Sequence, residues 1–382
     1  DSAGNTPVPM FTTFRLREMQ LENRVVVSPM CQYSAQDGTP NDWHLVHLGS
    51  RAVGGAGLLI TEMTNVCADG RITPGCTGMY NEEHVASWTR IVDFAHQNSR
   101  TKICLQLAHA GRKGAVSHPW EGDDTPLPAN QAWPTIGPSA LAFREDWVTP
   151  REMNQADMDT VLAAFVESTR MAERAGFDMI ELHSAHGYLL HEFLSPIANT
   201  RNDAYGGPIE NRMRFPLEVF AAIRGVWPEA KPIGLRISAT DWVDNGWTLE
   251  DSVVYAQKLK ALGCDYICAS SGGISEKQRL ELGEGFQVSF AERIRKEVDI
   301  PTMAVGMIYD PHHAESIVTD GQSDMVALAR GLLFDPHWAV RAAAVLDVES
   351  TSPPQYERAY GFQFLRDKER EWARARPAEA TE

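Results

Sequence analysis

Several features are scarce or absent in this sequence of 382 residues, and each absence excludes a class of protein. No run of about 18 apolar residues occurs, so no segment predicts a membrane-spanning helix. The N-terminus lacks the basic and apolar regions of a signal peptide. The six cysteines are too sparse for a disulfide framework, and none forms a C-x-x-C pair. We therefore expect a cytoplasmic protein with reduced thiols.

Positive charge is also in short supply. The chain has 35 Lys and Arg residues against 51 Asp and Glu residues, which leaves a formal charge of -16. A surface of this sign repels phosphate backbones and anionic lipids, so we expect neither nucleic acid nor a membrane as a partner.

A dinucleotide-binding fingerprint is missing too. No G-x-G-x-x-G motif opens a helix, so a Rossmann domain is not supported and any nicotinamide nucleotide has to bind without one.

What the sequence does contain is a regular alternation of short apolar segments and longer segments with helical periodicity. Near-continuous apolar runs are typical of strands buried on both faces, and their alternation with helices favours parallel pairing. Eight such units predict an α/β fold, the (β/α)8 TIM barrel. The expected strands are residues 24–28, 57–62, 102–107, 178–183, 233–238, 265–270, 302–306 and 324–329.

The intervals between these strands carry further signals. Residues 154–175 have one apolar helical face, with Asn154 placed as N-cap and Gly176 after the end. Asp335 and Pro336 resemble an N-cap and a first helical residue. Residues 108–153, after the third strand, hold three tryptophans and six prolines, so we expect a lid or hairpin over the barrel mouth. We divide the chain into a tail or linker (1–9), the barrel (10–360) and a C-terminal extension (361–382).

Active sites of such barrels lie at the carboxyl ends of the strands, and His183, His186 and Tyr188 follow the fourth expected strand. The histidines could bind a metal ion, but the carboxylates or further histidines of a metal site are missing from the first strand. They could also merely cap the strand end. A third reading is that two imidazole N–H groups polarise one substrate carbonyl, while Tyr188 holds a proton for a carbanionic centre.

Other strand ends point to an anion. Arg236 places a permanent charge among apolar neighbours, so it requires a carboxylate, a phosphate, a reduced cofactor or a nearby acid such as Glu62 or Glu181. Gly306 and Arg330 follow the last two strands, where barrels commonly bind phosphate. The strand ends contain no lysine, which weakens a Schiff-base aldolase interpretation.

Residues 28–33 (SPMCQY), 106–113 (QLAHAGRK), 183–189 (HSAHGYL), 193–196 (FLSP) and 205–212 (YGGPIENR) resemble the old yellow enzyme family of FMN-dependent ene-reductases. The similarity runs from about residue 10 to residue 360. Cys31, the paired histidines and residues 355–360 resemble its thermophilic-like subclass, and residues 119–123 resemble the xenobiotic-reductase branch.

The resemblance implies a role for each matching residue. It implies that FMN is held by Ser28, Pro29, Met30, Cys31, Met63, Gln106, Arg236, Gly306, Ala329 and Arg330. His183 and His186 would bind the substrate carbonyl, Tyr188 would donate the proton, Tyr33 would line the pocket, and the Cys31 thiol would tune the flavin potential. No metal ion is implied.

The resemblance also implies a ping-pong reaction and an assembly. NADPH or NADH would reduce FMN and leave, and an activated alkene would then receive the hydride at its β-carbon and a proton from Tyr188 at its α-carbon. Arg358 matches an arginine that reaches the active site of a neighbouring subunit, so we expect a homodimer or homotetramer. Two alternatives remain: the reductase domain of a bifunctional aromatic acyl-CoA monooxygenase/reductase, and a flavin-based redox sensor with Cys31 as the responsive thiol.

Overall fold

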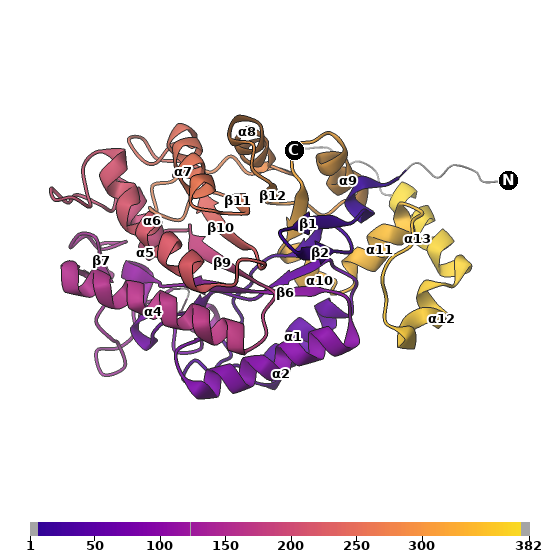
Figure 1. Ribbon diagram of the computed structural model, residues 1–382, viewed down its shortest axis with the longest axis horizontal. Coiled ribbons are helices and arrows are strands. Elements are labelled where there is room, and N and C mark those ends of the chain that lie inside the picture. The colour runs from indigo at the N-terminus through magenta and orange to yellow at the C-terminus, as the bar shows by residue number, and fades with distance from the viewer. Residues whose placement is uncertain (1–6, 123, 376–382) are drawn as a thin grey trace.

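The computed structural model describes residues 7–122 and 124–375, which form a closed barrel of eight parallel strands (Figure 1). Each strand pairs with the next along the chain, and the last pairs with the first. The strands are β3 (Val25–Val27), β4 (Leu58–Ile60), β6 (Lys102–Ala108), β9 (Met179–Ser184), β10 (Ile233–Ser238), β11 (Tyr266–Ser270), β12 (Thr302–Val305) and β13 (Met325–Leu328). The predicted (β/α)8 fold is confirmed, and every expected strand overlaps one of these. A short strand, β5 (Thr64–Asn65), extends the sheet beside β6.

Helices alternate with the strands and surround them (Figure 1). They are α1 (Asp42–Ala52), α2 (Glu82–Asn98), α4 (Gln155–Arg174), α5 (Leu189–Leu194), α6 (Ile209–Val226), α7 (Leu249–Ala261), α8 (Val288–Val298), α9 (Pro311–Thr319), α10 (Arg330–Phe334) and α11 (Trp338–Val345), with 3-10 turns η1 (Pro9–Phe11) and η2 (Ala68–Gly70). None of the helices in the described residues is long and apolar enough to cross a membrane.

Local sequence signals explain where these helices begin and end. The side chain of Asn154 accepts a hydrogen bond from the backbone N–H of Asp157, and Gly176 has a φ of 91°, so α4 has the predicted limits. The predicted helix start at Asp335 is wrong. Asp335 ends α10 and α11 begins only after His337, because the Asp335 carboxylate accepts the His337 backbone N–H and pairs with Arg341 at 2.7 Å.

The barrel interior changes from apolar to polar along the strands. Its amino-terminal part is filled by apolar side chains and closed by the hairpin of β1 (Phe14–Leu16) and β2 (Met19–Leu21). Because side chains alternate along a strand, the inward positions that follow Cys104 and Met179 are Gln106 and Glu181. Polar side chains therefore lie at the carboxyl ends of the strands, and apolar side chains fill the barrel interior on the amino-terminal side of them.

The insertion that follows β6 packs over the mouth of the barrel, as predicted. It contains η3 (Gly111–Lys113), α3 (Pro119–Gly122), β7 (Ile136–Gly137) and β8 (Arg151–Glu152). β7 and β8 pair in parallel, so the insertion is a lid built from turns and not a hairpin. Its Val116 and Trp147 share one buried cluster with Met63 and Ala108 at the barrel mouth. Asp123, part of the predicted insertion motif, lies outside the described residues.

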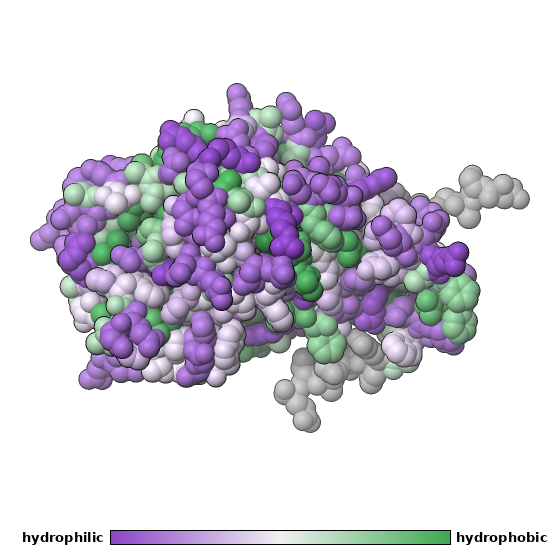
Figure 2. All heavy atoms as spheres, turned by 90° about the horizontal axis from the view of Figure 1, so that it is seen from below, coloured by the Kyte–Doolittle hydropathy of each residue, from purple (hydrophilic) through white to green (hydrophobic). Residues whose placement is uncertain are grey.

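The C-terminal segment folds back against the barrel. It consists of η4 (Pro354–Tyr356), α12 (Glu357–Tyr360) and α13 (Gln363–Ala375). Helix α13 packs on α11, where Arg341 pairs with Glu369 at 2.9 Å. Figure 2 shows hydrophobic residues gathered at the end of the molecule that α12 and α13 form; the exposed ones are Tyr356, Phe362, Phe364, Leu365 and Trp372. The domain limits stay a prediction, and residues 1–6 and 376–382 of the predicted tail and extension lie outside the described residues.

Candidate active site

Polar residues from neighbouring strands meet at the carboxyl end of the barrel. The strand register places Arg236 of β10 beside His183 of β9, and Gln106 of β6 beside Glu181 of β9. Ser28, which follows β3, accepts a hydrogen bond from Nη1 of Arg236 at 2.9 Å. These five residues are at most 8% exposed. The structure thus brings together predicted site residues that are up to 208 positions apart in the chain.

The charge of Arg236 has no ionic partner within the described residues. Neither acid considered for that role forms an ion pair with it: Glu62 contacts His44, and Glu181 accepts hydrogen bonds from Gln106 and from the Tyr266 hydroxyl. Burial raises the pKa of Glu181, although Arg236 opposes this effect. Nε of Arg236 is buried without a hydrogen bond. The guanidinium is therefore left available to an anion at the mouth of the barrel.

The two histidines and Tyr188 form one aromatic group. The ring centroid of His183 lies 5.2 Å from those of both His186 and Tyr188. Burial, with Arg236 as the next cause, holds the pKa of both imidazoles well below the usual range, so both are neutral at pH 7. Nε2 of His186 lies 2.6 Å from the Ser270 hydroxyl, whereas Nδ1 of His183 has no hydrogen-bond partner among the residues that the structure describes. In residues 7–122 and 124–375, no group of three potential ligands is placed to bind a metal ion.

Tyr188 is the first residue before α5 and faces the cluster formed by the lid. Burial raises the pKa of its hydroxyl well above the usual value, so the phenol keeps its proton throughout the neutral range. It packs with Cys31, Tyr33, Phe143 and Trp147. A phenol that is both protonated and partly enclosed can act as a proton donor.

Cys31 and Tyr33 lie on the segment after β3, across this cluster from Tyr188. Burial raises the pKa of the Cys31 thiol, and a hydrogen bond with the backbone of Met63 opposes the rise. The thiol is therefore protonated, not a reactive thiolate. Tyr33 has a φ of 51° and its ring packs edge-on against Trp120 of the lid at 5.9 Å. The lid and the β3 segment thus meet over the site.

The last two strands end in the region predicted for a phosphate. Gly306 follows β12 with a φ of 124°, and a Cβ at this position would lie 2.7 Å from Nε2 of Gln287, so only glycine fits. Ala329 and Arg330 follow β13, which pairs with β12. Arg330 is exposed and forms no ion pair within the described residues. Pro29 and Met30 lie between Ser28 and Cys31 and are partly buried.

Arg358 lies apart from this group. It is exposed on α12 in the C-terminal segment, and no hydrogen bond or ion pair of its side chain is found in the described part of the chain. The structure of a single chain therefore does not bring it to the other site residues.

These residues fit FMN. The flavin becomes anionic on reduction, and the buried Arg236 has an unused Nε and no ionic partner. The Oε1 of Gln106 remains free as an acceptor because only its Nε2 is used by Glu181. Gly306 supplies a backbone without a side chain at the end of β12, and the exposed Arg330 follows the paired strand β13. Residues 9–349 match the NADH:flavin oxidoreductase / NADH oxidase family. The chain belongs to this family.

Relatives within the NADH:flavin oxidoreductase family span nearly the whole chain. The NADPH dehydrogenase of Geobacillus thermodenitrificans (strain NG80-2) is 42% identical over 355 residues, which cover 92% of this chain and 99% of that protein. The NADPH dehydrogenase of Bacillus subtilis (strain 168) is 40% identical over 353 residues, with the same shares. The solved structure of morphinone reductase in complex with tetrahydroNAD is 27% identical, with a TM-score of 0.72 over 91% of this chain and 93% of that one.

Membership in this family confirms several predictions. The chain is an oxidoreductase, its cofactor is FMN, and its reductant is a nicotinamide nucleotide. The resemblance to the old yellow enzyme family is likewise confirmed. The roles of individual residues are not tested by these similarities and stay predictions.

Two features of the site were missed at the level of sequence. The strand ends contain no lysine, yet Lys113 reaches the site from η3, and its Nζ donates to the backbone oxygens of His186 and Gly273, both at 2.9 Å. Ser270 stands at the end of β11, but nothing in the sequence indicates that its hydroxyl contacts His186. Both contacts join residues far apart in the sequence, so no local pattern reveals them.

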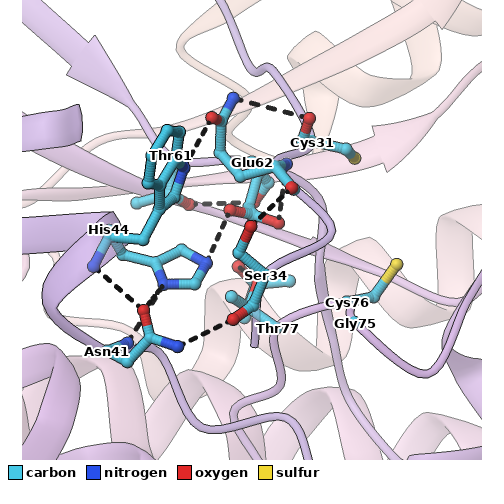
Figure 3. A network of polar contacts seen from close by, with 12 residues as sticks. Cys31, Ser34, Asn41, His44, Thr61, Glu62, Gly75, Cys76 and Thr77 are labelled. Atoms are coloured by element: carbon cyan, nitrogen blue, oxygen red, sulfur yellow. Dashed lines mark hydrogen bonds and ion pairs between the residues drawn. The ribbon is translucent and has the colours of Figure 1, made fainter. Parts of the chain in front are cut away.

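A buried polar network supports the segment that carries Cys31 (Figure 3). Nδ1 of His44 accepts the backbone N–H of Asn41, which leaves the proton on Nε2, and Nε2 lies 3.3 Å from Oε1 of Glu62. The other oxygen of Glu62 accepts the backbone N–H of Gln32 at 3.4 Å. The start of α1 and the end of β4 thus hold the chain next to Cys31.

Proposed function

We propose that this flavoenzyme reduces the activated C=C bond of α,β-unsaturated carbonyl compounds or nitroalkenes at the expense of NADPH or NADH. The observation that carries this proposal is the convergence of His183, His186 and Tyr188 at 5.2 Å ring separations beside the unpaired Arg236. Two neutral N–H donors and one protonated phenol suit a substrate that gains negative charge on oxygen and a proton on carbon.

FMN, when bound, supplies the hydride that it receives from the nicotinamide nucleotide. The residues that would hold it are Ser28, Pro29, Met30, Cys31, Met63, Gln106, Arg236, Gly306, Ala329 and Arg330. Arg236 would neutralise the charge of the reduced form, and it is held for this by its hydrogen bond to Ser28. Gly306 and Arg330 would bind the phosphate group. The protonated Cys31 thiol would contact the flavin and tune its potential.

The imidazoles of His183 and His186 would bind the substrate oxygen. Both are neutral because of burial and the nearby Arg236, so each offers one N–H and no full charge. In His186, the bond between Nε2 and Ser270 leaves Nδ1 for the substrate. Hydrogen bonds of this kind contribute about 1–3 kcal/mol each when charge builds on the acceptor. The pair therefore favours the enolate-like transition state over the ketone.

Tyr188 would hold the proton that the α-carbon receives. The raised pKa of its hydroxyl keeps that proton in place until a carbanionic centre forms beside it. Tyr33, Trp147 and Phe143 close the pocket around it and exclude water, which would otherwise compete as a proton source. Tyr33 would also determine which substrates fit.

The deciding experiment follows the colour of the protein. The purified yellow holoenzyme should bleach with NADPH under anaerobic conditions and recover its colour when cyclohexenone is added. A redox sensor would bleach and stay colourless with the alkene. In Tyr188→Phe, bleaching should proceed as in the wild type while turnover of cyclohexenone falls roughly a hundredfold, which is typical for loss of a general acid. Unchanged turnover would refute the role of Tyr188.

We further propose that the enzyme is a homodimer or homotetramer in which Arg358 of one subunit reaches the site of its neighbour. Support comes from exposed apolar side chains on two adjacent helices, Trp43 and Val46 on α1 and Phe334 on α10, which is 85% exposed. Arg51 of α1 donates to the backbone oxygen of Leu332 in α10, so the two helices lie in contact. A second copy would cover these exposed side chains.

Light scattering with and without the double change Trp43→Glu and Phe334→Glu tests the assembly. The wild type should have at least twice the monomer mass, and the double variant should be a monomer with impaired enone turnover. Arg358→Ala should keep the assembly but impair turnover. A monomeric wild type with normal activity would exclude a shared site.

A further inference from the structure

Lys113 occupies an unusual place beside the candidate substrate site. Lys113 is the last residue of η3 in the lid. Its Nζ donates to the backbone oxygens of His186 and Gly273, each at 2.9 Å. It forms no ion pair within the described part of the chain. Nζ also lies 4.6 Å from the ring of Phe143 and 5.2 Å from the ring of Tyr188. The contacts of the cation are therefore with backbone dipoles and aromatic faces.

The two oxygens that Lys113 binds belong to loops that touch backbone to backbone. A Cβ added to Gly187 would lie 2.1 Å from the oxygen of Gly273, and one added to Gly273 would lie 2.5 Å from the Cα of His186. No side chain fits between these loops. Because both carbonyl groups turn toward the same place, a cation between them removes the repulsion of the two dipoles.

The loop after β9 is strained at the residue that matters for binding. His186 has a φ of 60°, a left-handed conformation that is uncommon for residues other than glycine. Three contacts hold it there. Its backbone N–H donates to Ser238 at 2.9 Å, its backbone oxygen accepts from Lys113, and the next N–H, that of Gly187, donates to His191 at 2.8 Å. Of these three, the contact to Lys113 is the one that joins the backbone oxygen of His186 to that of Gly273.

We propose that Lys113 is a positioning residue, which fixes the left-handed turn at His186 and so sets the direction in which that imidazole meets the substrate. The idea rests on the proposed function, since it assumes that His186 binds a carbonyl oxygen. Strain of this kind persists only where the surroundings over-determine it. Without the ammonium group, the turn can relax, and the imidazole loses its alignment.

The electrostatic surroundings agree with this role. Burial lowers the pKa of Lys113 to about 8, Asp124 opposes the change, and Arg112 adds to it. The positive charge of Lys113 in turn contributes to keeping the imidazoles of His183 and His186 neutral. Neutral imidazoles keep one acceptor nitrogen each, which His186 needs for its hydrogen bond to Ser270.

A double-mutant cycle tests the inference with the FMN-loaded protein. The variants are Lys113→Met, which keeps the length of the side chain but removes its donors, His186→Ala, and both together. Lys260→Met is the control, because Nζ of Lys260 also bridges two backbone oxygens, those of Val298 and Asp299. These lie at the end of α8 and not at the site, and Nζ is there also 3.5 Å from the Asp299 carboxylate. The first readout is the dissociation constant of the oxidised holoenzyme for cyclohexenone, measured by the change in flavin absorbance without reductant. The second is kcat/KM.

We expect Lys113→Met to retain FMN and to weaken cyclohexenone binding and kcat/KM by roughly tenfold, with no comparable loss in Lys260→Met. In the His186→Ala background, Lys113→Met should change the dissociation constant for cyclohexenone and kcat/KM by less than about twofold. The effects of two substitutions are not additive when one residue acts through the other. Values for Lys113→Met within twofold of the wild type, additive losses in the cycle, or an equal loss in Lys260→Met would each overturn the inference.

Two further measures keep the outcome unambiguous. If Lys113→Met fails to fold or loses FMN, Lys113→Leu, which also lacks donors, replaces it, and the same criteria apply. Because the binding readout needs no turnover, it separates the two proposals. A wild type that binds cyclohexenone without reducing it would refute the proposed function, and the binding cycle would still decide the role of Lys113.

Discussion

The imidazole Nε2 of His186 and the hydroxyl oxygen of Ser270 lie 2.6 Å apart, although their strands, β9 and β11, are separated by β10. Such a contact fixes both the ring orientation and the place of the ring proton. If Ser270 donates to Nε2, the proton of the neutral imidazole resides on Nδ1, which is where a substrate carbonyl needs it. In the proposed reaction, Ser270 would thus set which nitrogen of His186 donates to the substrate.

Loss of the Ser270 hydroxyl should therefore impair the enone reaction. In Ser270→Ala, the imidazole can adopt either tautomer and rotate, so we expect kcat/KM for cyclohexenone to fall about three- to tenfold, the value of one hydrogen bond. Reduction by NADPH should change less. Ser271→Ala is the control, because that hydroxyl donates to Gln287 and not to the site. Equal losses in both variants would contradict the assignment.

Arg236 should be the main electrostatic determinant of cofactor binding. Arg236→Leu removes a buried cation without an ionic partner, so we expect the dissociation constant for FMN to rise roughly ten- to a hundredfold, the range for hydrogen bonds to charged groups. Arg236→Lys should lose less, because it keeps the charge but not the fork of donors. Ser28→Ala, which removes the Nη1 partner and the contact that Ser28 would make to FMN but leaves the charge of Arg236, should lose least. Fluorescence titration of each apoprotein with FMN gives the order of the dissociation constants. Tighter binding of FMN by Arg236→Leu than by the wild type would refute the role of Arg236.

The sequence was sufficient for the fold and for the strand-end residues, and the reason lies in their periodicity. An inward position on a strand is defined by alternation, so His183, Arg236 and Gln106 could be placed at one end of the barrel before any coordinates. Lys113 could not, since η3 is a turn and its side chain reaches loops 73 and 160 positions away. The prediction at Asp335 was wrong because it used only a local pattern. An Asp–Pro pair is typical of a helix start, but here α11 begins after His337, and the Asp335 carboxylate forms an ion pair with Arg341 on α11.

Stability should depend on the ionisation of Glu192. This glutamate is fully buried in α5 and accepts the backbone N–H of Arg112 at 3.1 Å, and burial raises its pKa to about 8. Between a pH of about 4.5, where an unfolded glutamate titrates, and about 8, the folded state holds a proton that the unfolded state has lost. The stability contributed by this protonation is complete below that window and is lost as the pH rises through it.

Glu192→Gln should remove this pH dependence, because an amide does not titrate. The free energy of unfolding of Glu192→Gln, relative to that of the wild type, should rise by about 4 kcal/mol between pH 5 and pH 9. About three of the pH units that separate the folded and unfolded pKa fall in this range, and each corresponds to about 1.4 kcal/mol. Thermal unfolding of both proteins at the two pH values measures the change. Glu83→Gln, at an exposed position on α2, is the control and should show a constant difference. A difference for Glu192→Gln that stays constant with pH would contradict the raised pKa.

Gly234 should be the least replaceable glycine of the barrel interior. A Cβ at this position of β10 would lie 1.7 Å from the ring of Tyr266, which stands beside it on β11 and donates its hydroxyl proton to Glu181 at 2.5 Å. In Gly234→Ala, the ring has to move, and the buried carboxylate then loses a donor. Overpacking with a lost buried hydrogen bond costs about 3 kcal/mol or more. Gly225→Ala, at a position in α6 where a Cβ would contact nothing within 4 Å, should instead raise stability by about 0.5–1 kcal/mol. Thermal unfolding of the two holoenzymes should therefore shift in opposite directions, and a melting temperature of Gly234→Ala at or above that of the wild type would show that the β10–β11 contact tolerates a methyl group.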